Sequence, residues 1–217
     1  SFSSPKCEKK ALEYLNYFKN SKSIIIDLRG NKNGEAPLNL VKAFMDRPYR
    51  YWCESTPLNL GLLSCYNEML NKYSKIMSSH KKDLLSLSKL FNQSSLIWSS
   101  SYEKDLNTIF NGKVYIIADS STSGAAEDFM IPFKDNKRGT ILGEKTAGST
   151  GLSYTYDFGN GISINIATKR TYFPDGSAFE GIGISPDIGI HPSIDELKAK
   201  DDAVLNEAIR IVNMFVK

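Results

Sequence analysis

Residues 113–129, KVYIIADSSTSGAAEDF, decide the fold. Their apolar beginning has the length and the residue types of a buried β-strand. Small hydroxyl residues follow, and the apolar residues of GAAEDFMIPFK then recur at helical spacing. A strand, a tight turn of small residues and a helix start often display a serine nucleophile, because the turn exposes the hydroxyl and the helix end favours negative charge. The stretch therefore raises the question of which residue, if any, is a nucleophile.

Strands and helices alternate along most of the chain around this stretch. Short apolar runs that are typical of buried strands are separated by segments with helical spacing, and Gly-Asn-Gly joins two alternating runs into a predicted β-hairpin. This alternation predicts an α/β core with an appended β-hairpin. The supporting segments are SIIIDL (23–28), APLNLVKAFM (36–45), GTILGE (139–144), SYTYDFG (153–159), ISINIATKR (162–170) and an amphipathic helix at 200–215 with Asp201 or Asp202 as its cap.

The composition is typical of one soluble globular domain. The 217 residues are 41% hydrophobic and 24% charged, with a net charge of +3. Lysine and arginine are scattered along the chain, so we expect a solvated surface and no nucleic-acid partner. No apolar run reaches membrane-spanning length and no signal peptide is present. The abrupt start at SFSS suggests a fragment of a longer chain.

The cysteine and histidine content argues against a metal site. Cys7, Cys53 and Cys65 have no metal-ligand spacing, and the two histidines, His80 and His191, lie far apart in the sequence. An odd cysteine count also argues against a disulfide framework; Cys53 and Cys65 are either a pair or buried free thiols. We therefore expect no metal and no cofactor.

Three further segments contain candidate functional residues. DLRGNKNGE (27–35) ends a buried strand, and its Gly34 would let a backbone N–H face a ligand; an Asp27–Arg29 structural ion pair is the alternative. GEKTAGSTG (143–151) comes close to a phosphate-binding loop, but serine replaces the required lysine and a strand follows it, so nucleotide binding is rejected. Glu180 is either a carboxylate aimed into a cleft or an exposed loop residue.

The order of these motifs resembles that of the carboxy-terminal-processing (tail-specific) serine peptidases, most closely their tricorn-like branch. Asp-Leu-Arg-x-Asn-x-x-Gly comes first, then the strand that ends in small hydroxyls with AAEDF, then GEKTAGSTG, and last PDG with EGIGISPDI. The resemblance covers nearly the whole chain except residues 49–110. It implies a core of the type shared by Clp peptidases and crotonases, a mixed β-sheet flanked by helices. Residues 1–217 would form a single catalytic core, with a helical lobe inserted at 49–110.

The resemblance implies that the nucleophile is missing. In this family the nucleophilic serine stands three residues before the glutamate of a Ser-Ala-x-Glu motif. Three residues before Glu127 is Gly124, which is a tolerable helix N-cap but supplies no hydroxyl. Ser123 lies one position early, and a register slip that makes it the nucleophile is the alternative.

The resemblance also leaves the general base outside this chain. One branch of the family uses a lysine where this chain has Ser149. The tricorn-like branch uses an upstream histidine supported by a late glutamate, and Glu180 matches that glutamate. Neither His80 nor His191 matches the base, so a catalytic histidine would lie before Ser1 or on another chain.

Backbone N–H groups near Gly34 and at Ala125 would form the oxyanion hole by the same resemblance. The family usually has Gly-Gly where this chain has Asn33-Gly34, which makes the first donor less secure. Gly148 and Ser149 of the Gly-rich loop would border the substrate cleft.

Two functions of different classes follow. The first is a serine-type endopeptidase core that acts on a peptide or protein substrate and is inactive as given, because Gly124 occupies the nucleophile position. The second is a non-catalytic relative that binds peptides along open strand edges. Family members work mostly outside the cytoplasm, so we expect an extracytoplasmic or secreted protein. An upstream domain of the parent chain or a second copy is an expected partner.

Overall fold

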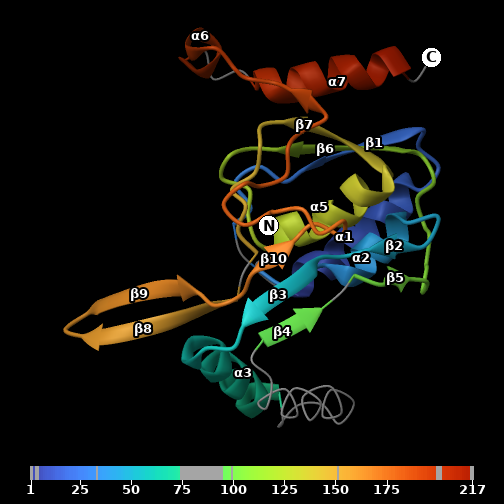
Figure 1. Cartoon of the computed structure of the whole chain (residues 1–217). Helices are drawn as coiled ribbons and strands as arrows, with labels where there is room; N and C mark the ends of the chain where they lie inside the picture. Colours follow the sequence, from blue (N-terminus) through green and yellow to red (C-terminus); the bar gives the residue numbers. More distant parts are fainter. Residues whose placement is uncertain are drawn as a thin grey trace.

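The computed structural model describes residue 2 and residues 5–32, 34–73, 95–98, 100–150, 152–198 and 202–215. Its centre is a sheet of four parallel strands in the order β1-β6-β7-β11 (Figure 1). Antiparallel pairing is confined, in the described ranges, to three smaller sheets. The central strands are β1 (Ser23–Asp27), β6 (Lys113–Ala118), β7 (Gly139–Gly143) and β11 (Ile188–Gly189).

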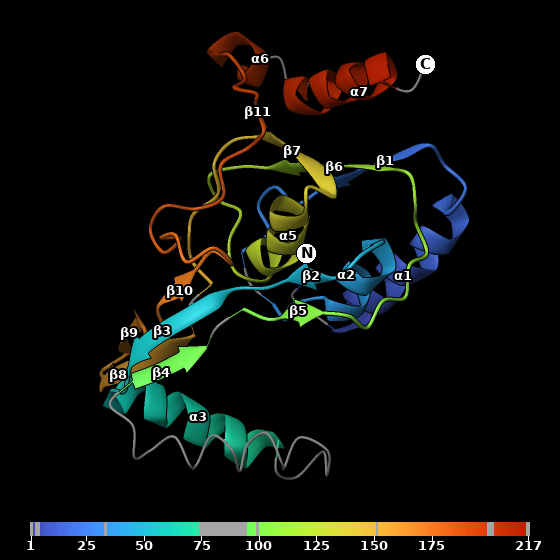
Figure 2. The same cartoon turned by 45° about the vertical axis from the view of Figure 1, so that its right-hand side comes forward.

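Helices cover both faces of the central sheet (Figures 1 and 2). Ile116 of β6 packs into the core shared with α1, α2 and α5, whereas Tyr115 and Ile117 pack against α7 on the other face. Because successive side chains of a strand point to opposite faces, a strand covered on both faces needs an unbroken apolar run. These helices are α1 (Pro5–Phe18), α2 (Leu38–Phe44), α5 (Ala125–Asn136) and α7 (Ala203–Phe215).

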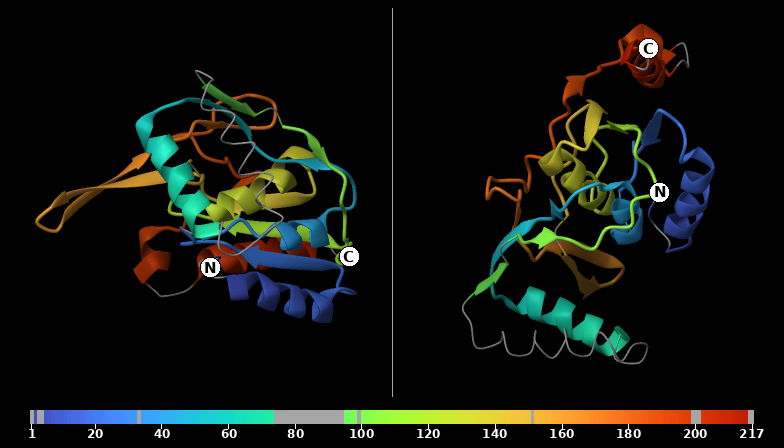
Figure 3. Two further views of the ribbon diagram at one scale, coloured as in Figure 1. Left: turned by 90° about the horizontal axis from the view of Figure 1, so that it is seen from below. Right: turned by 90° about the vertical axis from the view of Figure 1, so that its right-hand side faces the viewer.

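The remaining elements form the smaller sheets and two further helices. The predicted hairpin is present as β8 and β9 and projects from the body of the molecule (Figures 1 and 3). In the inserted region, β3 pairs with β4 and β10, β2 pairs with β5, and α3 follows β3. Residues 74–94 of the helical lobe predicted at 49–110 lie outside the described residues. The bounds are β2 (Tyr49–Arg50), β3 (Cys53–Pro57), α3 (Leu60–Tyr73), β4 (Ser95–Trp98), β5 (Tyr102–Glu103), β8 (Ser153–Gly159), β9 (Ile162–Ala167), β10 (Thr171–Tyr172) and α6 (Ile194–Lys198).

Helix α7 is connected to the sheet edge by a charge cluster. Arg29 follows β1 and donates hydrogen bonds to both Asp27 and Asp202, the latter through two nitrogens at 2.7 and 2.6 Å. Asp202 also caps α7, since its carboxylate accepts the N–H of Leu205 at 3.0 Å. The sequence left the cap open between Asp201 and Asp202; Asp202 makes a capping bond, and Asp201 lies outside the described residues. No helix in the described ranges is both long and apolar enough to cross a membrane.

Helix α5 follows a glycine N-cap, and a glutamate in its first turn accepts a hydrogen bond from that glycine. Gly124 is its N-cap, and Glu127 at the third helical position accepts the N–H of Gly124 at 3.2 Å. Glu127 has no exposed surface. Its other partners come from the loop after β7: the hydroxyl of Thr146 and the N–H groups of Gly148 (2.8 Å) and Ser149 (3.0 Å). One buried carboxylate therefore joins the helix start to the Gly-rich loop.

Replacing Asp202 by asparagine should remove part of the acid sensitivity of the fold. Hydrogen bonding to Arg29 and to the N–H of Leu205 lowers the pKa of Asp202 to about 2. A depressed carboxyl pKa adds stability above the unfolded value of about 3.9 that is lost as the pH falls through the folded value. Urea unfolding at pH 2 to 5 should therefore show less stability loss on acidification for Asp202→Asn than for the unchanged chain. Asp195→Asn, at an exposed carboxylate of α6, is the control, and identical pH profiles for both variants would contradict the assignment.

Replacing Glu127 by glutamine should destabilise the fold by about 2–3 kcal/mol, because an amide nitrogen would then face N–H donors that have lost their acceptor. Glu144→Gln is the matched control, since that carboxyl group lies at the start of the Gly-rich loop after β7 but is partly exposed. Chemical denaturation measures both changes. Equal free energies of unfolding for the two variants would show that Glu127 does not hold the loop.

Candidate functional site

The loops after β1 and β6 lie together at the carboxyl edge of the sheet. The two strands are paired in parallel, with Asp27 opposite Ile117. Beyond the strands, the N–H of Gly30 donates to Asp119 Oδ1 at 3.2 Å, and the N–H of Ser123 donates to the carbonyl of Asn31 at 2.9 Å. These bonds fix the first loop against the turn that leads into α5. Carboxyl edges of parallel strands are the usual location of ligand sites in α/β sheets.

The Gly-rich loop after β7 adds a third wall. The sequence places its strand beside β6, and the structure bears this out. The N–H of Gly124 donates to the carbonyl of Ser149 at 2.8 Å, and the N–H of Ala147 donates to the carbonyl of Thr122 at 3.0 Å. Together with the bonds to Glu127, these contacts hold residues 146–149 beside the start of α5.

The three loops and the base of the hairpin enclose a cavity of about 510 Å³. It brings together five residues predicted from the sequence, Gly34, Ser123, Gly124, Ala125 and Ser149. The other lining residues are Lys32, Asp128, Thr150, Leu152, Ser153, Asn165 and Ala167. Asn33 and Gly151 lie outside the described residues.

Gly148 and Glu180 do not line this cavity. Gly148 lies behind the wall, where a Cβ atom would come within 2.5 Å of the backbone nitrogen of Gly183, so only glycine fits without a shift of backbone. The Glu180 carboxyl is half-buried, and its Oε1 is buried without a hydrogen-bond partner in the described part of the chain. Burial raises the pKa of Glu180; a contact with Thr171 opposes that shift.

Gly124 has the backbone conformation of a strand-to-helix elbow that would be strained for a residue with a Cβ atom. Its φ of 61° and ψ of −127° lie in a region that residues with a Cβ atom rarely adopt. Elbows of this type display catalytic serines at the start of a helix, where the strain projects the side chain away from the turn. The hydroxyl of the preceding Ser123, the alternative nucleophile, donates to the carbonyl of Lys32 at 3.0 Å.

The start of α5 offers an unused hydrogen-bond donor. Within the described ranges, no group accepts a hydrogen bond from the N–H of Ala125, the first residue of the helix. Helix N-termini carry a partial positive charge and attract oxygen atoms with developing negative charge. Gly34, with φ of 129°, lines the same cavity. The cavity is therefore lined both by the N-terminus of α5 and by a glycine with a positive φ.

Sequence reasoning missed Asp128. Its Oδ1 accepts the indole N–H of Trp52 at 2.7 Å and the hydroxyl of Thr150 at 2.9 Å. Burial raises the pKa of Asp128, and the bonds to Trp52 and Thr150 oppose this shift. The one available signal was its position four residues after Gly124, which places both residues on one face of α5.

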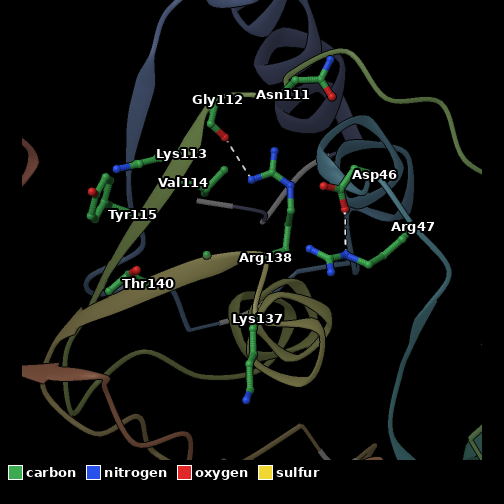
Figure 4. A pocket seen from close by; sticks show the side chains of 11 residues that line it. Asp46, Arg47, Asn111, Gly112, Lys113, Val114, Tyr115, Lys137, Arg138 and Thr140 are labelled. Atoms are coloured by element: carbon green, nitrogen blue, oxygen red, sulfur yellow. Dashed lines mark hydrogen bonds and ion pairs between the residues drawn. The ribbon is translucent and has the colours of Figure 1, made fainter. Parts of the chain in front are cut away.

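A second cavity, of about 310 Å³, opens at the opposite edge of the sheet where β6 and β7 begin (Figure 4). The guanidinium group of Arg138 donates to three backbone carbonyls there, and Arg47 pairs with Asp46 at 3.1 Å. Arg138 thus holds chain segments together, whereas Arg47 pairs with its neighbour in the sequence. This cavity contains none of the residues predicted for the site.

The described residues contain neither a histidine in the lining of the cavity at Gly124 nor a cluster suited to a metal ion. His191 is 75% exposed and lies beside Glu144, outside the lining of the cavity at Gly124. His80 lies outside the described residues. The described residues contain no group of three or more histidine, cysteine or acidic side chains that could hold a metal ion.

Several solved structures have the same fold. Mature CPAF superposes with a TM-score of 0.72 at 16% identity, over all of this chain and 49% of CPAF. The photosystem II D1 C-terminal processing protease gives a TM-score of 0.55 at 19% identity, over 88% of this chain and 41% of that one. The tricorn protease gives 0.55 at 17% identity, over 92% of this chain and 16% of that one. These similarities confirm the fold predicted from the sequence.

Sequence comparisons give the family. The chloroplastic C-terminal processing peptidase of Tetradesmus obliquus is 30% identical over 94 residues, which are 43% of this chain and 20% of that protein. The carboxy-terminal-processing protease of Bartonella bacilliformis is 25% identical over 95 residues, 44% of this chain and 22% of that protein. The chain thus spans about a fifth of the length of these curated relatives. The profile of peptidase family S41 matches residues 1–190. The predicted resemblance is confirmed: the chain belongs to peptidase family S41.

Proposed function

We propose that this chain is a serine-type endopeptidase core that binds peptide segments in the cavity around Gly124 and does not cleave them, because glycine occupies the nucleophile position. One observation supports the proposal above all others. A residue without a side chain stands at the strand-to-helix elbow, on the wall of a cavity that Ala125 also lines. The N–H of Ala125 has no acceptor among the described residues. The substrate is a peptide or a protein.

The geometry supports a division of roles in the reaction of a serine-containing relative. A serine at position 124 would attack the scissile carbonyl, whose oxygen would receive hydrogen bonds from Ala125 and from backbone near Gly34. Glu180 would orient a histidine supplied from outside this chain. Without the hydroxyl, the same donors still bind a substrate carbonyl, so peptide binding persists while acyl transfer is lost.

A non-catalytic peptide-binding relative is the second candidate. It is favoured by the hydrogen bond from Ser123 to Lys32, which engages the hydroxyl of the residue that precedes Gly124. The two candidates differ in whether the oxyanion donors and the general base can still support catalysis. Restoring the hydroxyl at position 124 separates them.

The same proposal includes a single core at 1–217 with an inserted lobe at 49–110. It also includes an upstream domain or a second copy as partner, and an extracytoplasmic location. The name of one curated relative places it in the chloroplast. The family resemblance supports a location outside the cytoplasm for this chain.

Gly124→Ser in the full-length parent protein should react with a fluorophosphonate probe, whereas the unchanged protein should not. The same substitution should lower the free energy of unfolding by about 1–3 kcal/mol, because serine is strained at this positive φ. Gly176→Ser is the stability control: it has a φ of 85° in an open turn, where a Cβ atom meets nothing within 4 Å.

Two further variants complete the labelling experiment. Gly124→Ala should stay unlabelled. Labelling of the unchanged protein that disappears in Ser123→Ala would make Ser123 the nucleophile and contradict the assignment of Gly124. A folded Gly124→Ser protein that does not react with the probe would favour the non-catalytic peptide-binding relative.

A further inference from the structure

The cavity at Gly124 contains one carboxylate among its described lining residues, that of Asp128. Its other lining residues are mostly glycine, alanine, hydroxyl or amide residues, and its one lysine, Lys32, is exposed. A cavity of this chemistry is a poor environment for a large apolar side chain and a good one for a polar or charged group.

The Asp128 side chain is held in one orientation. Trp52 and Thr150 both donate to the same oxygen, Oδ1. Trp52 is itself fixed by aromatic packing, with its ring 4.2 Å from that of Phe179. The second oxygen, Oδ2, takes part in none of the hydrogen bonds of the described residues, and it is not one of their fully buried atoms that lack a partner. Asp128 lines the cavity, and Oδ2 is its carboxylate oxygen without a hydrogen-bond partner among the described residues.

The negative charge of Asp128 is incompletely balanced by its surroundings. Lys169 is the cation that attracts it, but the ammonium group of Lys169 is paired with Glu54 at 2.6 Å. Glu127, the preceding residue, adds a second negative charge nearby. A cationic group that enters the cavity would therefore gain a charge-assisted hydrogen bond from an oriented, partly desolvated carboxylate.

We propose that Asp128 selects peptides with a lysine or arginine side chain at the residue held in this cavity. The inference rests on the proposed function, because it specifies which peptides that site accepts. Asp128 lies one helical turn beyond Gly124 on the same face of α5, so its carboxylate borders the space next to the scissile position. It acts as a specificity residue and not as a nucleophile or base.

Fluorescence anisotropy with peptides of one length tests the inference. The peptides differ only at a central residue, which is lysine, arginine, norleucine or glutamate. The unchanged chain should bind the lysine and arginine peptides roughly tenfold or more tightly than the norleucine peptide, and the glutamate peptide least tightly. In Asp128→Asn the ratio of dissociation constants should approach one, because asparagine keeps an oxygen for Trp52 and Thr150 but removes the charge.

Asp135→Asn is the matched control, since it removes a carboxylate from the same helix at a position outside the cavity lining. It should keep the preference for basic peptides. Asp128→Glu is a second variant that keeps the charge and should keep the preference even if Asp128→Asn does not fold. Equal binding of lysine and norleucine peptides by the unchanged chain, or a preference that persists in folded Asp128→Asn, overturns the inference and leaves the proposed function intact. If no peptide of any class binds, the proposed function fails and the inference fails with it.

Discussion

The structure of the site depends on the buried carboxylate of Glu127. It accepts N–H groups from Gly124 at the start of α5 and from Gly148 and Ser149 in the Gly-rich loop. A carboxylate with no exposed surface is tolerated because these donors and the positive end of the helix replace its lost water. Separating the loop from the helix would leave the charge and its donors unpaired. Two walls of the cavity are therefore kept in one arrangement by a residue that does not line it.

The same constraint explains the conformation of Gly124. Its N–H is shared between the carbonyl of Ser149 and the carboxylate of Glu127, and this fixes the peptide plane before the helix. The turn from β6 into α5 then requires a positive φ, which glycine adopts without strain. The elbow is thus formed by its surroundings, whichever residue occupies it. The chain retains the geometry that displays a side chain at this point while lacking the side chain.

Predictions from the sequence were most accurate where the deciding contacts are local. The apolar run of β6 predicted a strand buried on both faces, Gly-Asn-Gly predicted the β8–β9 hairpin, and the spacing after Gly124 predicted α5. Glu127 was recognisable as a capping glutamate, because its partner Gly124 is three residues away. Its bonds to Gly148 and Ser149 were not, since these residues are 21 and 22 positions distant. Asp128 was missed because Trp52, its partner, is 76 residues away.

The sequence by itself therefore determined several core strands and helices, the β8–β9 hairpin, the family and the glycine at position 124, because strand and helix periods and turn chemistry act within a few residues. Only the tertiary structure decided that Gly34, Ala125 and Asp128 line one cavity and that the half-buried Glu180 is not among its lining residues. It also decided that Arg29 joins Asp27 to Asp202 across 173 residues. Such contacts depend on how the strands are ordered and which helices cover them. Any one polar residue has many potential partners along the chain, and packing of the whole core selects among them.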